Sequence, residues 1–448
     1  MPLIAHASAD AVVAYRAGVP ILARDFLADV ARVGAALGSG GHVLNACADR
    51  YRFTVGLAAS LLLGKVSLLP AARTPEVIGQ LRRFAPDLVC LSDEVPCELE
   101  LPLVRFPDAD EAAAPAVPVA PAPVPLIDPA QRAAWVFTSG STGAPLPHQK
   151  TFGKLINCVQ VQAQRFGLLD GRSHAIVATV PAQHMYGLES SVLIALATGQ
   201  ALCAERPFYP ADICTTLAAL PRPRVLISTP IHLRALMASG LAVPDTDLIV
   251  SATAPLAAQL AAEVEHHCGT VLLEIYGSTE TGAIAVRRPT ESPEWRLWPE
   301  VQIETRDGET WARGGHIEQP TRMGDVLELT GPGRFLLHGR VTDLVNVAGK
   351  RSSLAYLNYQ LNSIPGVIDG AFFHGEAPAA DPTIARVGAC VVAPALNAAA
   401  IVAELRRRID PVFLPRPLLL VASLPRTSTG KLPQEALLSL AAQAKSTA

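Results

Sequence analysis

The chain has 448 residues, a length at which one hydrophobic core usually gives way to two or more domains. Hydrophobic residues make up 50% of the sequence and charged residues only 17%, which excludes an intrinsically disordered chain. The formal net charge of -3 leaves no excess of basic residues for a nucleic acid, so nucleic-acid binding is excluded as well.

The N-terminal part of the chain shows neither a targeting segment nor a membrane span. Met1–Asp10 lacks the basic stretch and long apolar run of a secretory signal peptide, so we expect a cytoplasmic protein. The most apolar window, Phe53–Leu63, ends at Gly64 and Lys65 and is too short for a bilayer, which needs about 20 residues. This window is therefore predicted to be a buried helix.

The middle of the chain alternates short apolar runs with helical stretches. A surface crossing at 108–129 precedes them, because its many prolines disfavour a helix and a central strand. Buried strands are predicted at Ala134–Phe137, Ala175–Val180, Val225–Ser228, Leu248–Ser251 and Val271–Ile275. A helix is predicted over Pro255–His267, with Gly269 just past its end. This order predicts an α/β fold with mostly parallel sheets covered by helices.

The sequence changes character near residue 340. A glycine-dotted stretch from Gly324 to Gly349 leads into a shorter α+β segment, which closes with an alanine-rich helix at Leu437–Ala448. We therefore predict a large N-terminal domain, 1–339, and a small C-terminal α+β domain, 340–448.

Two glycine- and hydroxyl-rich segments each follow a predicted strand. The first is Thr138-Ser139-Gly140-Ser141-Thr142-Gly143, whose glycines allow a sharp turn and whose N–H and O–H groups can surround a phosphate. The second is Tyr276-Gly277-Ser278-Thr279-Glu280-Thr281, where the ring can stack on a base and the carboxylate can hold Mg²⁺ between phosphates. Taken alone, each segment is also compatible with an ordinary surface turn.

Two further segments carry charged side chains toward the C-terminus. Asp325 follows Gly324 and can accept hydrogen bonds from the two hydroxyl groups of a ribose, although such an aspartate is also common in plain turns. Pro425–Lys431 ends in Lys431, one of few lysines in the chain, and its alternative is an exposed lysine in a turn. The order and spacing of all four segments favour the functional interpretation.

In that order, the four segments resemble the adenylate-forming superfamily of acyl-CoA synthetases, peptide-synthetase adenylation domains and luciferases. The resemblance covers most of the chain. Pro181–Gly187 is similar to the P-x-x-H-x-x-G segment at the acyl pocket, and Ser251–Leu256 to the strand and turn that line the acid. Gly339–Arg351 is similar to the interdomain hinge and the thiol-side loop.

The resemblance implies a ligase that uses ATP and Mg²⁺ to convert a small carboxylic acid to its acyl-AMP and then passes the acyl group to a thiol. The small domain would be mobile, and the catalytic residues would be Lys431, Glu280 and Thr138, with Glu280 also binding the metal. The nucleotide would be bound by Ser139, Gly140, Ser141, Thr142, Gly143, Tyr276, Gly277, Thr279, Asp325 and Arg340. The acid would be bound by His184, Tyr186, Gly187, Ala252, Thr253 and Ser278. The hinge and the thiol side would comprise Thr342, Asp343 and Gly349.

The chain departs from the family pattern at three places. Leu146 stands where the phosphate-loop motif usually has a lysine, although Lys150 lies near enough in sequence to offset the loss. Ala252-Thr253 replaces the usual Gly-Gly, which predicts a reshaped acid site without a long tunnel for fatty acids. At the hinge, Thr342 precedes the acidic residue.

Two histidine-containing segments can also be explained without a catalytic or metal-binding role. His184 either gates or lines the acyl pocket or only packs beside its aromatic neighbour, and both alternatives remain open. His266-His267-Cys268 cannot direct three side chains at one ion, so a metal site there is rejected. The eight cysteines contain no C-x-x-C pair, which argues against a structural zinc site and a disulfide scaffold.

Within the superfamily, 144–148 and Gln183–Glu189 resemble the standalone ligases of bacterial aryl-polyene pigment clusters, including the xanthomonadin type. That branch implies a hydroxybenzoate-like acid and transfer to the phosphopantetheine thiol of an acyl carrier protein. The alternative is an acyl-CoA synthetase that converts an aryl or medium-chain acid to its CoA thioester. A non-catalytic nucleotide-binding protein is disfavoured because Glu280, Asp325 and Lys431 are all retained.

Overall fold

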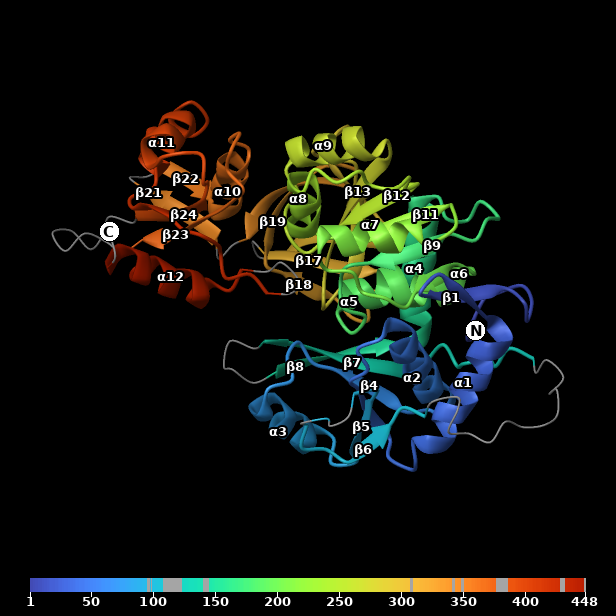
Figure 1. Ribbon diagram of the computed structural model, residues 1–448. Helices are drawn as coiled ribbons and strands as arrows, with labels where there is room; N and C mark the ends of the chain where they lie inside the picture. Colours follow the sequence, from blue (N-terminus) through green and yellow to red (C-terminus); the bar gives the residue numbers. More distant parts are fainter. Residues whose placement is uncertain are drawn as a thin grey trace.

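The computed structural model describes residues 1–94, 97, 99–107, 123–139, 145–306, 309–340, 343–347, 350–375, 386–427 and 432–446. Two large sheets and a smaller C-terminal unit make up its layers (Figure 1). Most of the predicted surface crossing at 108–129 lies outside the described residues.

A six-stranded sheet forms the N-terminal layer, in the order β6-β5-β3-β4-β7-β8. Its strands are β3 (His42–Asn45), β4 (Val66–Leu69), β5 (Leu88–Ser92), β6 (Leu103–Arg105), β7 (Arg132–Ser139) and β8 (Pro145–Thr151). All pairings are parallel except the β7–β8 hairpin. One face packs on α3 (Pro75–Phe84), and the other packs on α2 (Arg50–Leu62), which α1 (Ala23–Ala36) backs.

An eleven-stranded sheet forms the second layer, in the order β19-β20-β15-β14-β13-β12-β11-β9-β10-β1-β2. Its strands are β1 (Val12–Arg16), β2 (Val19–Leu22), β9 (Ala175–Ala178), β10 (Ala201–Cys203), β11 (Arg224–Ser228), β12 (Leu248–Ser251), β13 (Val271–Ser278), β14 (Gly282–Arg287), β15 (Trp295–Leu297), β19 (Asp325–Gly331) and β20 (Arg334–Arg340). In sheet order, the strands β1, β10, β9, β11, β12 and β13 are parallel to one another. β2 at one edge, and β14, β15, β20 and β19 toward the other edge, pair antiparallel with their neighbours. Beside it lies a three-stranded antiparallel sheet of β16 (Val301–Arg306), β17 (Glu309–Gly314) and β18 (Thr321–Met323).

Helices cover both faces of the eleven-stranded sheet because neighbouring residues of its strands point to opposite sides. In β11, Leu226 packs with α7 (Pro210–Ala218), α8 (Pro230–Ala238) and α9 (Ala258–Cys268). Val225 and Ile227 belong to the other core, which the two large sheets share. The helices of that shared core are α4 (Phe152–Phe166), α5 (Met185–Gly187), the π-helix η2 (Leu188–Leu193) and α6 (Ile194–Thr198), besides α1 and α2.

The C-terminal residues have hydrophobic cores of their own. A hairpin joins β21 (Leu344–Val347) to β22 (Lys350–Ser353), and a three-stranded sheet contains β23 (Asp369–Gly375), β24 (Arg386–Val392) and β25 (Leu418–Leu420). One face of that sheet packs on α10 (Leu354–Asn362), α11 (Ala398–Arg406) and the short η4 (Pro411–Phe413), and the other packs on α12 (Gln434–Ser446). Figure 1 shows this unit, coloured orange and red, beside α8 and β19 of the larger part.

The predicted α/β architecture of mostly parallel strands covered by helices is confirmed, and each predicted strand is present. The antiparallel end of the large sheet was not foreseen. One helix start was wrong: α9 begins at Ala258, not at Pro255. Thr253 has φ 80° and the Leu256 N–H donates to Glu274 Oε1 at 2.9 Å, so the chain before α9 is held in a non-helical turn.

None of the helices in the described part of the chain is both long and apolar enough to cross a bilayer. Phe53–Leu62 of the predicted buried helix lie within α2, whose residues are nearly all buried, and Leu63 follows the helix and is exposed. The cytoplasmic location stays a prediction.

Two buried histidines predict that acid destabilises the fold. Burial, together with the charges of Arg206 and Lys150 respectively, lowers the pKa of His232 and of His316 from 6.5 to about 4. In the unfolded chain both side chains bind a proton near pH 6.5, so the free energy of unfolding should fall as pH drops from about 6.5 toward 4. At pH 5 each histidine should contribute a loss of about 2 kcal/mol.

Urea unfolding at pH 7, 6 and 5 measures this loss. We expect His316→Gln to remove its own share, so that the variant loses less stability than the wild type between pH 7 and 5. A substitution at the exposed His266 serves as the control. Equal losses in the wild type and in His316→Gln would contradict the prediction.

Candidate active site

The predicted site segments lie where parallel strands of the two large sheets end. Thr138 is the second-to-last residue of β7, and Ala252 directly follows β12. Tyr276 lies near the end of β13, before the turn that contains Glu280. Ligands of open α/β sheets bind at the carboxyl ends of parallel strands. The fold therefore brings these segments to the edge at which such a ligand would bind.

His148 connects the two segments that were predicted to bind phosphate and metal. It lies in β8 opposite Val136 of β7. Its Nε2 atom forms a 2.8 Å hydrogen bond with Thr138 Oγ1 and lies 3.8 Å from Glu280 Oε1. Burial lowers the pKa of His148 below its usual value of 6.5; the Glu280 carboxylate opposes this shift, and the charge of Lys150 adds to it. Sequence reasoning did not select His148, whose only signal was its place directly after the phosphate-loop segment.

Lys150 has a different role from the one expected of it. Its Nζ atom donates a 2.7 Å hydrogen bond to the backbone carbonyl of Glu280, and the residue is only 5% exposed. Burial lowers the pKa of Lys150, while the negative charge of Glu189 raises it. The ammonium group therefore supports the Glu280 turn from inside the protein, which corrects the expectation that it offsets the lysine missing at Leu146.

Glu189 supports the same turn from the π-helix. Its Oε2 atom accepts a 3.1 Å hydrogen bond from the Ala283 N–H, and the carboxyl group is fully buried. Burial raises the pKa of Glu189 and Lys150 lowers it. A Cβ atom at Gly282, where φ is 73°, would lie 2.5 Å from Glu189 Oε1. The turn after Glu280 thus fits closely onto two buried groups of opposite charge.

Tyr276 and Asp325, both predicted to bind the nucleotide, lie together. The Tyr276 hydroxyl donates a 2.6 Å hydrogen bond to Asp325 Oδ2. The ring packs against Trp295 and Phe335, with centroid distances of 5.5 and 5.6 Å. A Cβ atom at Gly277 would lie 2.2 Å from the carbonyl oxygen at 282, which explains the glycine. The tyrosine therefore holds the carboxylate in place at the edge of the site.

The remaining residues of the Tyr276 segment shape the turn. The Ser278 hydroxyl lies 3.2 Å from Thr281 Oγ1, and the Thr281 N–H donates to Ser278 Oγ at 3.2 Å. Thr279 lies in the turn between them and is partly exposed. These contacts fix the backbone around Glu280, and the predicted ligand contacts of Ser278 and Thr279 stay predictions.

The P-x-x-H-x-x-G segment is built for close packing. The Tyr186 hydroxyl lies 3.1 Å from the carbonyl oxygen of Ser228 and 3.0 Å from that of Val250, at the ends of β11 and β12. A Cβ atom at Gly187 would lie 2.0 Å from the Pro181 carbonyl oxygen. His184 precedes the first turn of α5. Tyr186 and Gly187 therefore shape the pocket from within the protein, and their contact with an acid stays a prediction.

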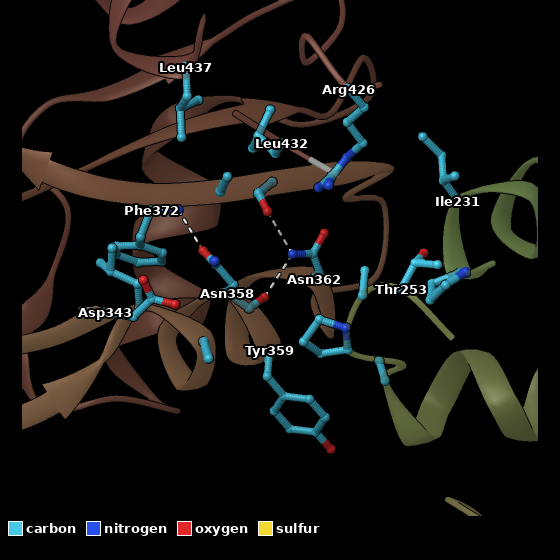
Figure 2. Close-up of a pocket in the computed structure, with 18 of the residues that line it drawn as sticks. Ile231, Thr253, Asp343, Asn358, Tyr359, Asn362, Phe372, Arg426, Leu432 and Leu437 are labelled. Atoms are coloured by element: carbon cyan, nitrogen blue, oxygen red, sulfur yellow. Dashed lines mark hydrogen bonds between the residues drawn. The ribbon is translucent and has the colours of Figure 1, made fainter. Parts of the chain in front are cut away.

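A cavity of about 270 Å³ lies between the large part of the chain and the C-terminal unit. Figure 2 shows Ile231 and Thr253 on the side of the large part, facing residues of the C-terminal unit. Ala252, also predicted to line the acid, is buried next to Thr253. The C-terminal unit contributes Asp343, Asn358, Tyr359, Phe372, Arg426, Leu432 and Leu437. The described residues that line the cavity do not include Thr138, Glu280, Tyr276 or Asp325. The cavity is thus distinct from the phosphate side of the site.

An ion network crosses the same boundary. Arg234 of α8 lies 3.3 Å from Asp369 Oδ1, at the start of β23. Arg426 donates to the same carboxylate, with its Nε 2.6 Å from Oδ2 and its Nη2 2.8 Å from Oδ1. The Asp369 side chain is only 12% exposed. This network joins the large part of the chain to the segment that leads to Lys431.

Several predicted site residues lie outside the described residues, namely Gly140, Ser141, Thr142, Gly143, Thr342, Gly349 and Lys431. Ser139 and Arg340 are described in the backbone only, at the ends of β7 and β20. Arg426 and Leu432, described residues on either side of 428–431 in the sequence, both line the cavity. The role of Lys431 stays a prediction.

The described residues contain no group of three or more His, Cys, Asp and Glu side chains that could hold a metal ion. Mg²⁺ is usually bound by one or two carboxylates together with substrate phosphates, and its binding by this protein stays a prediction. Glu280, with a side chain 34% exposed, is suited to such a shared ion.

The buried Lys150–Glu189 pair can be tested through stability. Lys150→Met leaves Glu189 without its countercharge and should lower the free energy of unfolding by about 3 kcal/mol. The double variant Lys150→Met/Glu189→Gln should be more stable than the sum of the single losses predicts, by about 1 kcal/mol or more. Urea unfolding of the three variants measures this coupling.

Lys154 provides the matched control, since its Nζ also donates to a backbone carbonyl, that of Gly315, at 2.6 Å. The losses in the free energy of unfolding from Lys154→Met and from Glu189→Gln should add in the double variant Lys154→Met/Glu189→Gln. Strict additivity in the Lys150 series would show that the two charges do not support each other.

Comparisons with known proteins agree with this geometry. A family model described as AMP-binding enzyme matches residues 24–310, more than half of the chain. A 4-coumarate–CoA ligase of Rhodobacter capsulatus is 31% identical over 66% of this chain and 73% of its own length. A 3-hydroxybenzoate–CoA/4-hydroxybenzoate–CoA ligase of Thauera aromatica is 23% identical over 80% of this chain and 73% of its own length.

The fold is shared with solved structures. ATP-bound MatB from Rhodopseudomonas palustris has a TM-score of 0.80 and covers 97% of this chain and 96% of its own at 19% identity. At that identity the likeness concerns the fold. The chain therefore belongs to the AMP-binding enzyme family, and the prediction of an adenylate-forming ligase is confirmed at the level of that family.

Proposed function

We propose that this enzyme uses ATP to adenylate a small aryl carboxylic acid, releases pyrophosphate, and transfers the acyl group to a phosphopantetheine thiol. The observation that carries the proposal is the meeting of Thr138 and Glu280 at His148, where two segments suited to phosphate and metal face each other. Tyr276 lies near the end of β13, the strand that precedes Glu280, and its pair with Asp325 is suited to the nucleoside.

The reaction brings two anions together, because the acid's carboxylate attacks the α-phosphorus of ATP. Catalysis must therefore come mainly from charge neutralisation and in-line positioning. Glu280 would hold Mg²⁺ together with phosphate oxygens, and the bound ion would neutralise charge on the pyrophosphate. Thr138 would contact the phosphates, and Asp325 would accept hydrogen bonds from the ribose hydroxyls.

A small, ring-shaped acid is supported by the cavity and by the relatives. The cavity of about 270 Å³ lies against the Thr253 turn and is lined by the apolar side chains of Ile231, Phe372 and Leu432. That volume is at the lower end for ligand pockets, which fits one aromatic ring better than a long acyl chain. The relatives include enzymes named for 4-coumarate and for 3- and 4-hydroxybenzoate.

Lys431 is proposed as the catalytic lysine that bridges the attacking carboxylate and the α-phosphate. Two observations support its delivery to the cleft. Arg426 and Leu432, on either side of the segment, both line the interdomain cavity. Asp369 binds Arg426 and also contacts Arg234 of the large part, so Arg426 is held at the boundary with the large part.

The proposed acceptor is a phosphopantetheine thiol, which both CoA and an acyl carrier protein carry. The names of the relatives favour CoA. The segments 144–148 and Gln183–Glu189 favour the carrier protein of the aryl-polyene branch, and with it a role in pigment biosynthesis. The C-terminal unit with Asp343 and Gly349 would move to admit either thiol.

An acid panel tests the proposed function. We expect 3- and 4-hydroxybenzoate and 4-coumarate to support pyrophosphate release with kcat/KM at least about tenfold above that of decanoate, because the cavity is short. Reactions without acid give the background. Adding CoA or phosphopantetheinylated carrier protein then identifies the acceptor by thioester formation. Preference for decanoate would move the assignment to a medium-chain acyl-CoA synthetase.

Lys431→Ala tests the lysine. Acid-dependent pyrophosphate exchange should fall by a factor of about 100 or more, because the loss of one preorganised charge contact removes about 3 kcal/mol of transition-state stabilisation. ATP affinity, measured by calorimetry, should change little. Lys445→Ala, in α12, provides the control, and exchange near the wild-type rate in Lys431→Ala would defeat the assignment.

A further inference from the structure

The structure gives β8 a direct role at the Glu280 turn. Residues i and i+2 of a strand point to the same face. His148 and Lys150 are such a pair, and both side chains point toward Glu280. Lys150 binds the backbone carbonyl at 2.7 Å, while His148 Nε2 lies 3.8 Å from the carboxylate. Gln149 points the other way and binds Arg132 at 3.1 Å.

We propose that His148 is a positioning residue of the reaction: through Nε2 it sets the Thr138 hydroxyl and the Glu280 carboxylate at the spacing that the phosphates require. The inference rests on the proposed function and adds a residue to it. His148 holds Thr138 by a 2.8 Å hydrogen bond, so the imidazole fixes one phosphate-side group directly and faces the other.

The Nε2 atom of His148 makes the contacts on which the proposal rests. The hydrogen bond to Thr138 and the approach to Glu280 both involve this nitrogen. The register of β7 and β8, with Val136 opposite His148 and Thr138 opposite Leu146, fixes His148 in the middle of β8, diagonally across from Thr138. The His148 side chain is 18% exposed, so it is anchored but still reaches the open edge of the site.

The chain around His148 explains why a histidine serves here. Leu146, where a lysine is usual in the motif that the segment resembles, is 54% exposed and carries no charge. Lys150 is buried under the Glu280 turn. Between them, His148 is the polar side chain of this strand face that lies beside both Thr138 and Glu280. Its Nε2 atom bonds the Thr138 hydroxyl and faces the Glu280 carboxylate at 3.8 Å.

Three substitutions separate the position of the nitrogen from the size of the side chain. The glutamine amide reaches about as far as Nε2, whereas the asparagine amide reaches only to the position of Nδ1. We therefore compare His148→Gln, His148→Asn and His148→Ala, with Gln149→Ala as the control on the opposite face of the same strand. Thermal unfolding of each variant shows whether the strand is intact.

The readout is the split between kcat and KM for acid-dependent pyrophosphate release, together with MgATP affinity by calorimetry. His148→Asn and His148→Ala should lower kcat about tenfold to a hundredfold, as the loss of groups that orient ligands typically does, with the KM for the acid nearly unchanged. His148→Gln should recover most of the rate. MgATP affinity should follow the same order, with glutamine above asparagine and alanine.

The outcomes separate this inference from the proposed function. Equal kcat and equal MgATP affinity for His148→Gln and His148→Asn would overturn the role of Nε2, as would wild-type values for His148→Ala. If the wild type binds MgATP without releasing pyrophosphate for any acid, the proposed function fails, and the order of MgATP affinities alone decides the role of His148. If the wild type does not bind MgATP, both proposals are overturned.

Discussion

The Glu280 turn depends on a charged side chain that is buried beneath it. Lys150, from the six-stranded sheet, donates to the Glu280 carbonyl at the end of a strand of the eleven-stranded sheet. Glu189 completes the support through the Ala283 N–H. A buried ion is stable only where other groups compensate its charge and satisfy its hydrogen bonds. The two sheets are therefore fixed to each other at the point where the carboxylate has to be placed.

The site divides into two compartments with different physical character. The phosphate side is polar and rests on the rigid junction of the two sheets, where Thr138, His148 and Glu280 meet. The proposed acid side is the cavity between the large part and the C-terminal unit, which apolar side chains and the charged residues Arg234, Asp343 and Arg426 line. Preorganised groups suit the stabilisation of developing charge, whereas a boundary between two units suits a step that must open and close.

Asp369 connects the C-terminal unit to the large part through Arg426 and Arg234, which both line this cavity. Its carboxylate binds Arg426 with two hydrogen bonds and contacts Arg234 at the longer distance of 3.3 Å. Burial lowers the pKa of Arg234, and the Asp369 charge raises it. The stronger contact lies within the C-terminal unit and the weaker one across the boundary. A movement of the unit would therefore break the contact with Arg234 first and keep Arg426 attached to Asp369.

The sequence by itself determined the order of strands and helices and the segments that carry the chemistry. Apolar runs and helix punctuation are local signals, so β7, β12 and β13 were predicted near their observed positions, and glycine-rich segments marked the strand ends. The start of α9 was missed because Glu274, from another strand, holds the Leu256 N–H and delays the helix. The antiparallel end of the large sheet was missed because short strands do not reveal the direction of their partners.

Only the tertiary structure decided which side chains work together. His148 lies beside Glu280 although 132 positions of sequence separate them, and Lys150 binds that residue's backbone carbonyl across 130 positions. Alternation along β8 gives the face on which a side chain lies, but the packing of two sheets decides what lies opposite. The sequence therefore indicated which chemical group each residue offers. Which other residue that group contacts depended on distances that only the folded chain sets.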